Sequence, residues 1–392
     1  MQVLLSVCGD AHLPQIARAL ENHNALGELW LSAKNSAGVS PNKFRRALLF
    51  HALVKPFYHL TSATFSQKVH NALFPVWRMW FRRQRPGFFD VAYSIPGHAT
   101  ELFDLADKES ALKVIDSVNS HPTSAYGFWQ RECDLFSPGS EPITPRWLFA
   151  RANRELERAD LIMCPSAFVR DSMLYNGIPE SKCALNPYGV YPAEFRKRTR
   201  LPETPRFVCV GLIGLRKGQQ YLFRAFEKVR QKLPQAELIC VGRPFSDFTR
   251  EWRRWRGTFQ HYELIPQAQL AEILSGATAF VLPSNEEGFA KAVIEGMASG
   301  LPVIATHESG ATTFVKDGEH GLIVRARDVD QIAEAMIKLA TDREANERMG
   351  RAAYARATVG NTWDDFAKRI IEICEEALAK RMNPNLRSIG VN

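Results

Sequence analysis

Several features that define other protein classes are missing from these 392 residues. The seven cysteines never form a CxxC pair, and several lie inside apolar runs, so we expect buried thiols in a reducing compartment rather than disulfides or a metal site. No apolar run approaches the roughly 20 residues that span a bilayer. The opening MQVLLSVCGD has no basic leader and predicts a first β-strand rather than a signal peptide. Together these absences predict a cytoplasmic protein.

Acidic residues are absent between Pro41 and Phe89, in a chain whose formal charge is +8. The basic residues of this stretch are Lys43, Arg45, Arg46, Lys55, Lys68, Arg78, Arg82, Arg83 and Arg85. The aromatic residues interleaved with them are Phe44, Phe50, Phe57, Tyr58, Phe65, Phe74, Trp77, Trp80 and Phe81. An anionic lipid surface attracts such a segment by about 1 kcal/mol for each Lys or Arg, which would hold the protein peripherally at the inner face of the membrane. A partly buried helical insertion with a solvated basic face explains the pattern equally well. No recognised motif supports nucleic-acid binding.

The alternation of short apolar runs and helical stretches predicts an α/β protein with two domains. From Phe207 onward, runs such as FVCVG, AELICVG and TAFVLPS are separated by helical periods, which is the pattern of βαβ units and a parallel sheet. The first half repeats it less regularly, and a polar, proline-bearing segment separates the two halves. We predict two Rossmann-like doubly wound domains, residues 1–199 and 200–361, with a last helix at about 362–380 that packs back onto the first. The strands of both domains would face a central cleft, where open α/β sheets bind ligands.

An NAD-dependent dehydrogenase also has doubly wound domains, but the signature of that class is missing. It requires GxGxxG directly after a strand. The three stretches that follow apolar runs, CGDAHLP, VGLIGLR and VGRPFSD, all lack this spacing. The sequence therefore argues against a dinucleotide-dependent dehydrogenase.

Residues 281–306, VLPSNEEGFAKAVIEGMASGLPVIAT, are the most informative part of the sequence. A buried strand leads into a polar turn, after which Glu287-Gly288-Phe289-Ala290 is predicted to open a helix. Free N–H groups and the helix dipole make such a start a phosphate site, and Gly288 lets a ligand approach the backbone. Glu287 would face the sugar of a donor and Glu295 its ribose. A glutamate in either place is commonly a capping or solvated residue, but Glu295 lies on an otherwise apolar helix, where a lone carboxylate needs a partner.

A second strand and turn, FVCVGLIGLRKG, lies at residues 207–218. Gly211 and Gly214 open the turn, and Lys217 is placed to act as a point charge for a diphosphate, with Arg216 beside it. The next strand ends in a similar way at Gly242. A glycine loop of this kind is a weak signal alone, and a much stronger one when the loop around Glu287 belongs to the same sheet.

Together the two stretches resemble the family 4 (group 1) retaining glycosyltransferases, which have the GT-B fold. VGLIGLRKG resembles the strand, glycine and lysine loop of that family, and Glu287 to Glu295 matches its E-x7-E spacing. ERADLIMCPSAFVRDSMLYNGIP and NPYGV, residues 157–190, resemble the segment that leads out of the family's first domain. The resemblance spans roughly residues 157–366.

The resemblance implies a role for each matching residue. Lys217 would bind the donor diphosphate, and Glu287, with the backbone of Gly288, Phe289 and Ala290, would meet the sugar. Glu295 would bind the ribose. The resemblance also implies retention of the anomeric configuration, no bound metal, and no cofactor, since the nucleotide-sugar is a substrate. Negative charge on the leaving diphosphate would be stabilised by fixed positive groups, which is commonly the largest catalytic contribution.

The chain departs from the family at three places. Leu212 stands where many members have an arginine, so Arg216 or a basic residue of the other domain would have to compensate. Ala290 stands where glycine is common. The glycine-rich loop after the first strand is reduced to Gly9-Asp10, which is the expected acceptor side.

Two histidines are candidates for the acceptor side. His121, after ALKVIDSVNS, is the preferred catalytic candidate, and His98, in SIPGHAT, is the second. A histidine at a strand end is often a surface or capping residue instead. Asp116 would either orient His121 or be structural.

The sequence therefore predicts a retaining glycosyltransferase. It would move a sugar from a UDP-, GDP- or similar nucleotide-sugar to a glycan or lipid-linked acceptor. The alternative is a catalytically silent GT-B protein that binds a nucleotide-sugar or a membrane partner, an interpretation that Leu212 keeps open.

Overall fold

A computed structural model describes residues 1–9, 12–32, 37–60, 63–140 and 144–383. The first half of the chain forms a sheet of seven parallel strands in the order β3-β2-β1-β4-β5-β6-β7. The strands are β1 Val3–Val7, β2 Leu26–Leu31, β3 Phe44–Arg46, β4 Val91–Ser94, β5 Leu112–Asp116, β6 Leu161–Cys164 and β7 Cys183–Leu185. The central strands are buried apolar runs, as parallel strands covered on both faces must be.

The second half forms a sheet of six parallel strands in the order β10-β9-β8-β11-β12-β13. The strands are β8 Arg206–Val210, β9 Glu237–Val241, β10 Gln260–Tyr262, β11 Ala279–Leu282, β12 Val303–Thr306 and β13 Gly321–Val324. The order reverses between β8 and β11, so the loops after these two strands open at the switch point where α/β sheets bind ligands. Two parallel sheets with alternating helices confirm the predicted fold class. The division predicted between residues 199 and 200 falls in the connection from β7 to β8.

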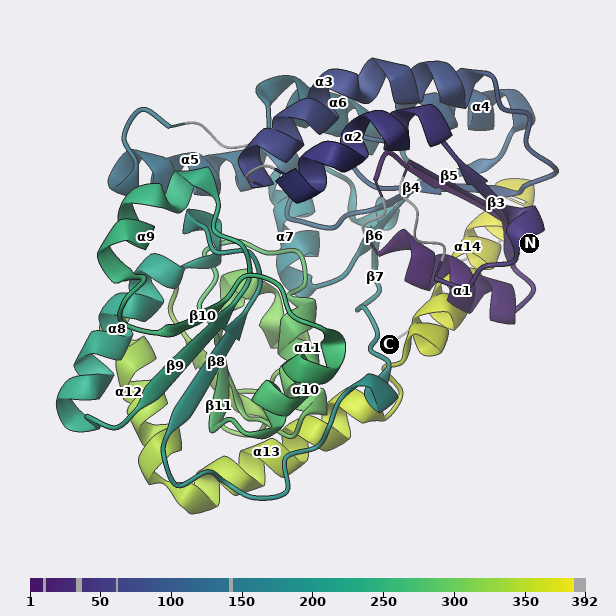
Figure 1. The fold of residues 1–392 in the computed structure, drawn as a ribbon. Coiled ribbons are helices and arrows are strands. Elements are labelled where there is room, and N and C mark those ends of the chain that lie inside the picture. Colours follow the sequence, from purple (N-terminus) through teal and green to yellow (C-terminus); the bar gives the residue numbers. More distant parts are fainter. Residues whose placement is uncertain (10–11, 33–36, 61–62, 141–143, 384–392) are drawn as a thin grey trace.

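Helices cover both sheets (Figure 1). The helices that follow strands of the first sheet are α1 Leu13–Asn22, α2 Leu48–Leu60, α3 Ala63–Arg82, α4 Thr100–Glu109, α5 Pro122–Phe136, α6 Arg146–Arg158 and α7 Ala167–Tyr175. The helices of the second half are α8 Gln219–Lys232, α9 Thr249–Trp255, α10 Gln267–Ser275, α11 Lys291–Ala298, α12 Val329–Thr341, α13 Arg343–Thr358 and α14 Trp363–Met382.

The last helix, α14, returns to the first sheet. It starts at a capping box between Thr362 and Asp365, which satisfies backbone N–H groups of the first turn. It contacts α1 and β5, and Figure 1 shows it beside α1. The chain passes close to itself at Gly189, where a Cβ atom would lie 2.3 Å from the Thr362 backbone. The end of the chain is therefore packed on its beginning.

The stretch without acidic residues forms the hairpin of α2 and α3. Its aromatic side chains are mostly internal, and Phe50, Phe74, Trp77 and Phe81 are buried in one cluster with Trp30 of β2. The burial of these aromatics agrees with the helical-insertion interpretation. The outer face of the same hairpin nevertheless exposes apolar side chains. These are Leu48, Leu49, Leu53, Phe65 and Met79. Among the described residues, no helix is both long enough and apolar enough to cross a bilayer.

Candidate active site

The loop after β8 is shaped by glycines that let neighbouring backbones approach. Gly211 and Gly242 both have positive φ, and a Cβ atom on Gly242 would lie 1.9 Å from the Gly211 carbonyl oxygen. Gly218 is left-handed at φ +75°, and a Cβ atom there would meet the Pro283 carbonyl oxygen at 1.9 Å. A short 3-10 turn, Leu215–Lys217, lies between these glycines. The loop therefore packs tightly against the end of β9 and against the loop that follows β11.

The loop after β11, residues 283–290, is bonded directly to this turn. Asn285 donates its backbone N–H to the Arg216 carbonyl (2.9 Å) and its side-chain amide to the Leu215 carbonyl (3.0 Å). The two loops from one parallel sheet therefore form a single unit, as the sequence predicted for strands of the same sheet.

One part of the sequence prediction is wrong: the helix does not open at Glu287. The helix α11 starts at Lys291, and Ala290 is its N-cap residue without a side-chain cap bond. The reason is that the Ala290 N–H, which would donate to the Glu286 carbonyl in a helix that opened at Glu287, is bonded elsewhere. Glu287 N–H donates to the Glu308 carbonyl (2.8 Å) and Ala290 N–H to the Ser309 carbonyl (3.3 Å). Residues 287–290 are thus an irregular loop held by the segment after β12.

Two cations of one loop meet two carboxylates of the other. Lys217 forms an ion pair with Glu287, and Arg216 Nη1 lies 3.3 Å from Glu287 and 3.1 Å from Glu286. Burial alone would raise the pKa of Glu287, but Arg216 and Lys217 outweigh burial and lower it. Burial would lower the pKa of Arg216, but Glu287 and Glu286 outweigh it and raise that pKa. Glu287 and Arg216 are therefore charged at neutral pH.

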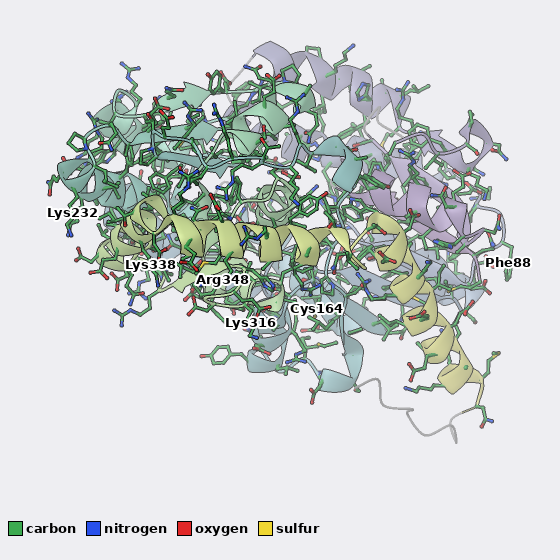
Figure 2. The ribbon with its side chains drawn as sticks, turned by 90° about the horizontal axis from the view of Figure 1, so that it is seen from below. Phe88, Cys164, Lys232, Lys316, Lys338 and Arg348 are labelled. Carbon is green, nitrogen blue, oxygen red and sulfur yellow. The ribbon has the colours of Figure 1, made fainter. Side chains whose placement is uncertain are left out.

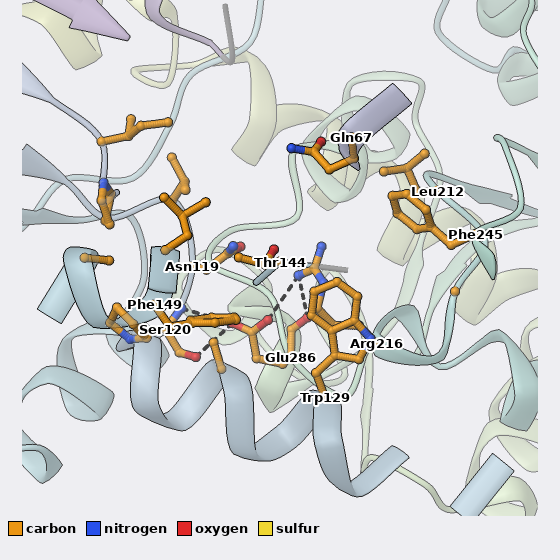
Figure 3. Close-up of a pocket in the computed structure, with 18 of the residues that line it drawn as sticks. Gln67, Asn119, Ser120, Trp129, Thr144, Phe149, Leu212, Arg216, Phe245 and Glu286 are labelled. Atoms are coloured by element: carbon orange, nitrogen blue, oxygen red, sulfur yellow. Dashed lines mark hydrogen bonds and ion pairs between the residues drawn. The ribbon is translucent and has the colours of Figure 1, made fainter. Parts of the chain in front are cut away.

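Glu286 connects this cluster to the other half of the chain. Its carboxylate accepts hydrogen bonds from Ser120 N–H (3.0 Å) and Ser120 Oγ (2.8 Å), in addition to the ion pair with Arg216. Figure 3 shows these contacts from Ser120 through Glu286 to Arg216. The sequence predicted a role for Glu287 and none for its neighbour Glu286. The available signal was the pair of adjacent glutamates in PSNEEGF.

A cavity of about 320 Å³ opens beside this cluster (Figure 3). From the first half it is lined by Gln67, Ile95, Pro96, His98, Val118, Asn119, Ser120, Pro122, Ala125, Trp129, Thr144, Leu148, Phe149 and Ala152. From the second half it is lined by Leu212, Gly214, Arg216, Lys217, Phe245, Asp247 and Glu286. Its only lysine and arginine side chains among these described residues are Lys217 and Arg216. Arg216 thus lies at the same cavity as Leu212, the position where the family commonly has an arginine.

Helix α5 of the first half braces the loop that carries Lys217. Glu132 is fully buried and accepts hydrogen bonds from Gln220 Nε2 (2.8 Å), Tyr221 OH (2.9 Å) and Arg327 Nε (2.6 Å), all from the second half. Gln220 Nε2 also donates to the Leu215 carbonyl at 2.9 Å. The side chain of Gln220 therefore links Glu132 to the 3-10 turn Leu215–Lys217.

Two further contacts join the halves beside this brace. Trp129 Nε1 donates to Asp247 at 2.8 Å. Gly288 lies so close to the first half that a Cβ atom would meet the Val118 carbonyl oxygen at 1.9 Å. Only glycine fits at position 288 when the halves are joined in this way.

His121 is a helix cap in the structure. Its Nδ1 accepts the Thr123 backbone N–H (3.3 Å) at the start of α5, and burial lowers its pKa to about 4. It is not among the residues that line the cavity, although Ser120 and Pro122 on either side of it are. His98 does line the cavity, and burial lowers its pKa to about 3. Both imidazoles are therefore neutral at pH 7.

Asp116 does not contact His121. It accepts a hydrogen bond from Tyr188 OH (2.9 Å), and its other oxygen lies 2.6 Å from His12 Nε2. His12 also packs against Tyr188, with ring centroids 4.3 Å apart. Tyr188 in turn meets Phe289 of the loop after β11 edge to face. His12 was not predicted as a site residue, because its only signal in the sequence is its place just after the first strand.

Gly9 ends the first strand region with φ +133°, but it does not line the cavity, and Asp10 lies outside the described residues. Glu295 lies on α11, is half-buried, and forms no hydrogen bond or ion pair through its carboxylate with any residue that the structure describes. Burial raises its pKa, and Lys291 opposes this only in part. The partner that the sequence analysis required for this carboxylate is therefore not a described protein group.

Metal ligation has no evident site. No three histidine, cysteine, aspartate or glutamate side chains within the described ranges are grouped as a metal ion would require.

Two Rossmann-like halves that meet at a charged pair of loops define the GT-B class of protein. Two solved structures share this fold along nearly the whole chain. HepE of Anabaena, solved with UDP-glucose, has a TM-score of 0.67 at 14% identity and covers 96% of this chain and 100% of its own. Sucrose-phosphate synthase from Thermosynechococcus elongatus has a TM-score of 0.66 at 18% identity, with coverages of 97% and 100%. At such low identity these likenesses establish the fold.

The predicted resemblance is confirmed for part of the chain, where residues 192–356 match the family model of the glycosyl transferases group 1. A relative from Mycobacterium tuberculosis is named GDP-mannose-dependent alpha-(1-6)-phosphatidylinositol monomannoside mannosyltransferase. It is 31% identical over 191 residues, which are 46% of this chain and 50% of the relative. The chain thus spans about half the length of that relative. The D-inositol 3-phosphate glycosyltransferase of Nocardia farcinica is 26% identical over 335 residues, with coverages of 77% and 72%.

Proposed function

We propose that this protein is a glycosyltransferase that moves a sugar from a nucleoside-diphosphate sugar to an acceptor in the cavity between its halves. One observation carries the proposal: Lys217 and Arg216 at the end of β8 meet Glu287 and Glu286 at the end of β11. Half-buried cations held by opposing carboxylates suit a diphosphate, which brings negative charge to the same place. The names of the relatives, which include GDP-mannose, and the UDP-glucose bound to HepE support a nucleotide-sugar donor.

Each group has a chemical role in this proposal. When the bond from the anomeric carbon to the diphosphate oxygen breaks, its electron pair stays on the diphosphate. The anomeric carbon then bonds to an acceptor hydroxyl oxygen, and the proton of that hydroxyl passes to the diphosphate. Lys217 and Arg216 would stabilise that charge from positions fixed by their ion pairs, and such preorganised charge is commonly the largest catalytic contribution. Glu287 would then release Lys217 and accept hydrogen bonds from sugar hydroxyls. The unpaired carboxylate of Glu295 would accept hydrogen bonds from ribose hydroxyls, which explains why a half-buried carboxylate lacks a described protein partner.

The finer chemistry belongs to the same proposal. Retention of configuration, catalysis without a bound metal, and the absence of any cofactor follow from the family resemblance. The roles of Gly211, Gly214, Gly242, Gly288, Phe289 and Ala290 as donor contacts do so as well. On the acceptor side, His98 lines the cavity while His121 caps α5, so His98 is the histidine better placed to contact an acceptor.

We propose that the acceptor is a glycan or lipid-linked molecule and that the enzyme works at an anionic membrane surface on its cytoplasmic side. The support is the outer face of α2 and α3, where Leu48, Leu49 and Phe65 are exposed by 62%, 64% and 49% in a stretch without acidic residues. Exposed apolar side chains beside basic ones suit an interfacial helix. The phosphatidylinositol in the name of the mycobacterial relative agrees with a lipid acceptor.

A thermal-shift panel tests the donor site. A ligand at about 100 times its dissociation constant adds about 2.7 kcal/mol of stability, so one nucleoside diphosphate and its sugar conjugate should raise the melting temperature while the bare nucleoside does less. No shift with any nucleoside diphosphate would refute the proposal. A shift without release of nucleoside diphosphate in a turnover assay would instead favour the silent binding protein.

A further inference from the structure

A second charged cavity lies away from the candidate active site, between the segment that leads into β8 and helix α13. Its volume is about 580 Å³. The residues that line it are Lys197, Arg198, Thr199, Arg200, Leu201, Gly300, Arg343, Glu347, Gly350 and Arg351. None of them lines the cavity beside Lys217. The proposed transfer reaction therefore leaves this cavity unexplained.

Positive side chains dominate the lining. Glu347 is the one acidic residue in the lining, and Arg343 Nε lies 3.2 Å from it. The Lys197 ammonium lies over the Tyr354 ring, 4.2 Å from its centroid. Arg200 and Arg351 are exposed, and their guanidinium groups have no hydrogen bond or ion pair to any residue in the described ranges. Like charges gathered around one hollow repel each other, so an anion that enters it gains from several of them at once.

The floor of the cavity is a fixed arginine. Arg198 donates through Nη1 to the Thr278 carbonyl (2.9 Å) and through Nη2 to Asn346 Oδ1 (2.8 Å), and its backbone N–H donates to the Ser299 carbonyl (2.8 Å). A Cβ atom on Gly350 would lie 2.9 Å from Arg198 Nη2, so glycine leaves the space that this guanidinium occupies. Burial lowers the pKa of Arg198 to about 10. A bound anion would relieve the cost of burying this charge.

We propose that this cavity binds a soluble ligand that carries at least two neighbouring phosphate groups. Arg200, from the segment before β8, and Arg351, from α13, would bind the phosphates. Arginine binds phosphate through paired N–H donors. A lipid headgroup fits less well, because α13 lies at the end of the molecule opposite the α2–α3 hairpin (Figure 1). Figure 2, seen from below, shows α13 running across that lower face with Arg348 on it.

Calorimetric titration with inorganic triphosphate tests the site. The full-length Lys217→Ala variant serves as the background, because we expect it to weaken phosphate binding at the loop after β8. Adding Arg200→Gln and Arg351→Gln should weaken triphosphate binding at least tenfold at about 0.15 M salt. A matched control adds Arg253→Gln and Arg348→Gln, two exposed arginines outside the cavity, and should keep the affinity of the background. Orthophosphate should bind the background at least tenfold more weakly than triphosphate.

Four outcomes would overturn the proposal. Equal triphosphate affinity in all three proteins would remove the cavity as a site. An equal loss of triphosphate affinity in the control would show that the effect comes from the net charge of the protein and not from this cavity. Orthophosphate binding as tightly as triphosphate would contradict the requirement for two phosphates. A parallel sedimentation with vesicles that contain a phosphoinositide should be unaffected by Arg200→Gln and Arg351→Gln, and a loss there would assign the site to a lipid headgroup instead.

Discussion

Glu287 is the residue on which the proposed chemistry depends most directly. It is 6% exposed, and its charge is maintained by Lys217 and Arg216 against the cost of burial. The substitution Glu287→Gln keeps the shape and removes the charge. We expect it to lower the rate of sugar transfer by about 100-fold or more, the range seen when one preorganised polar group is removed from an active site.

Circular dichroism should show that this variant stays folded, since Arg216 keeps Glu286 as a partner. Glu308→Gln, in the segment that holds the same loop, is the control and should transfer at close to the wild-type rate. Near-wild-type transfer by Glu287→Gln would remove Glu287 from the site.

Glu295 should show the opposite dependence of stability on pH from Glu287. Burial raises its pKa above the ordinary 4.5, so the folded protein holds this proton more tightly than the unfolded chain. The favourable contribution is complete below pH 4.5 and is lost as the pH rises through the folded pKa. The variant Glu295→Gln avoids this loss. Urea unfolding should therefore show that Gln increases the free energy of unfolding at pH 7 and not at pH 4. The same gain at both pH values would show that burial of the charge is not the cause.

At the scale of single residues, the sequence predicted contacts between residues that follow neighbouring strands of one sheet. Lys217 and Glu287 follow neighbouring strands, β8 and β11, whose carboxyl ends must meet at one edge. The contact of Ser120 with Glu286 joins residues 166 positions apart in different halves. Nothing in strand order fixes how the halves face each other, so this contact was not predicted.

Among the elements, α5 holds the two halves together. Glu132 is buried and bonded to Gln220, Tyr221 and Arg327. The substitution Glu132→Gln removes the charge that Arg327 pairs with, at an expected cost of about 3 kcal/mol in the free energy of unfolding. Because Gln220 also holds the Leu215 carbonyl, we expect the affinity for the nucleoside diphosphate to fall as well. Urea unfolding and calorimetric titration measure the two effects.

Asp134→Asn, an exposed change on the same helix, is the matched control and should alter neither quantity. A variant Glu132→Gln that is less stable but binds the nucleoside diphosphate as wild type does would show that α5 supports the fold and not the donor loop.

Strands were more predictable than helix starts. The buried apolar runs fixed the parallel sheets, since a strand covered on both faces must be apolar throughout. The start of α11 was placed four residues early, because the carbonyls of Glu308 and Ser309 capture backbone N–H groups of the preceding loop. Those carbonyls come from a distant segment, and local sequence carries no sign of them.

For the whole molecule, the outer face of α2 and α3 predicts binding to anionic vesicles. We expect sedimentation with such vesicles at low salt and release at high salt, because salt screens the attraction of exposed basic residues. Replacing Leu48, Leu49 and Phe65 by Gln should reduce sedimentation, since it removes apolar surface that would enter the lipid. The control replaces Leu264 and Val359, which are exposed by 79% and 73% elsewhere. Sedimentation that does not depend on lipid charge would contradict binding to an anionic membrane and would favour the interpretation of the hairpin as a partly buried insertion.

The central claim is that two loops of one sheet converge on a diphosphate, and a titration of Lys217→Ala tests it most directly. The nucleoside diphosphate that binds the wild-type protein and its bare nucleoside would be titrated into both proteins. The account predicts that removing the Lys217 ammonium weakens the nucleoside diphosphate at least tenfold and changes the affinity for the nucleoside little. Equal weakening of both ligands, or of neither, would contradict it.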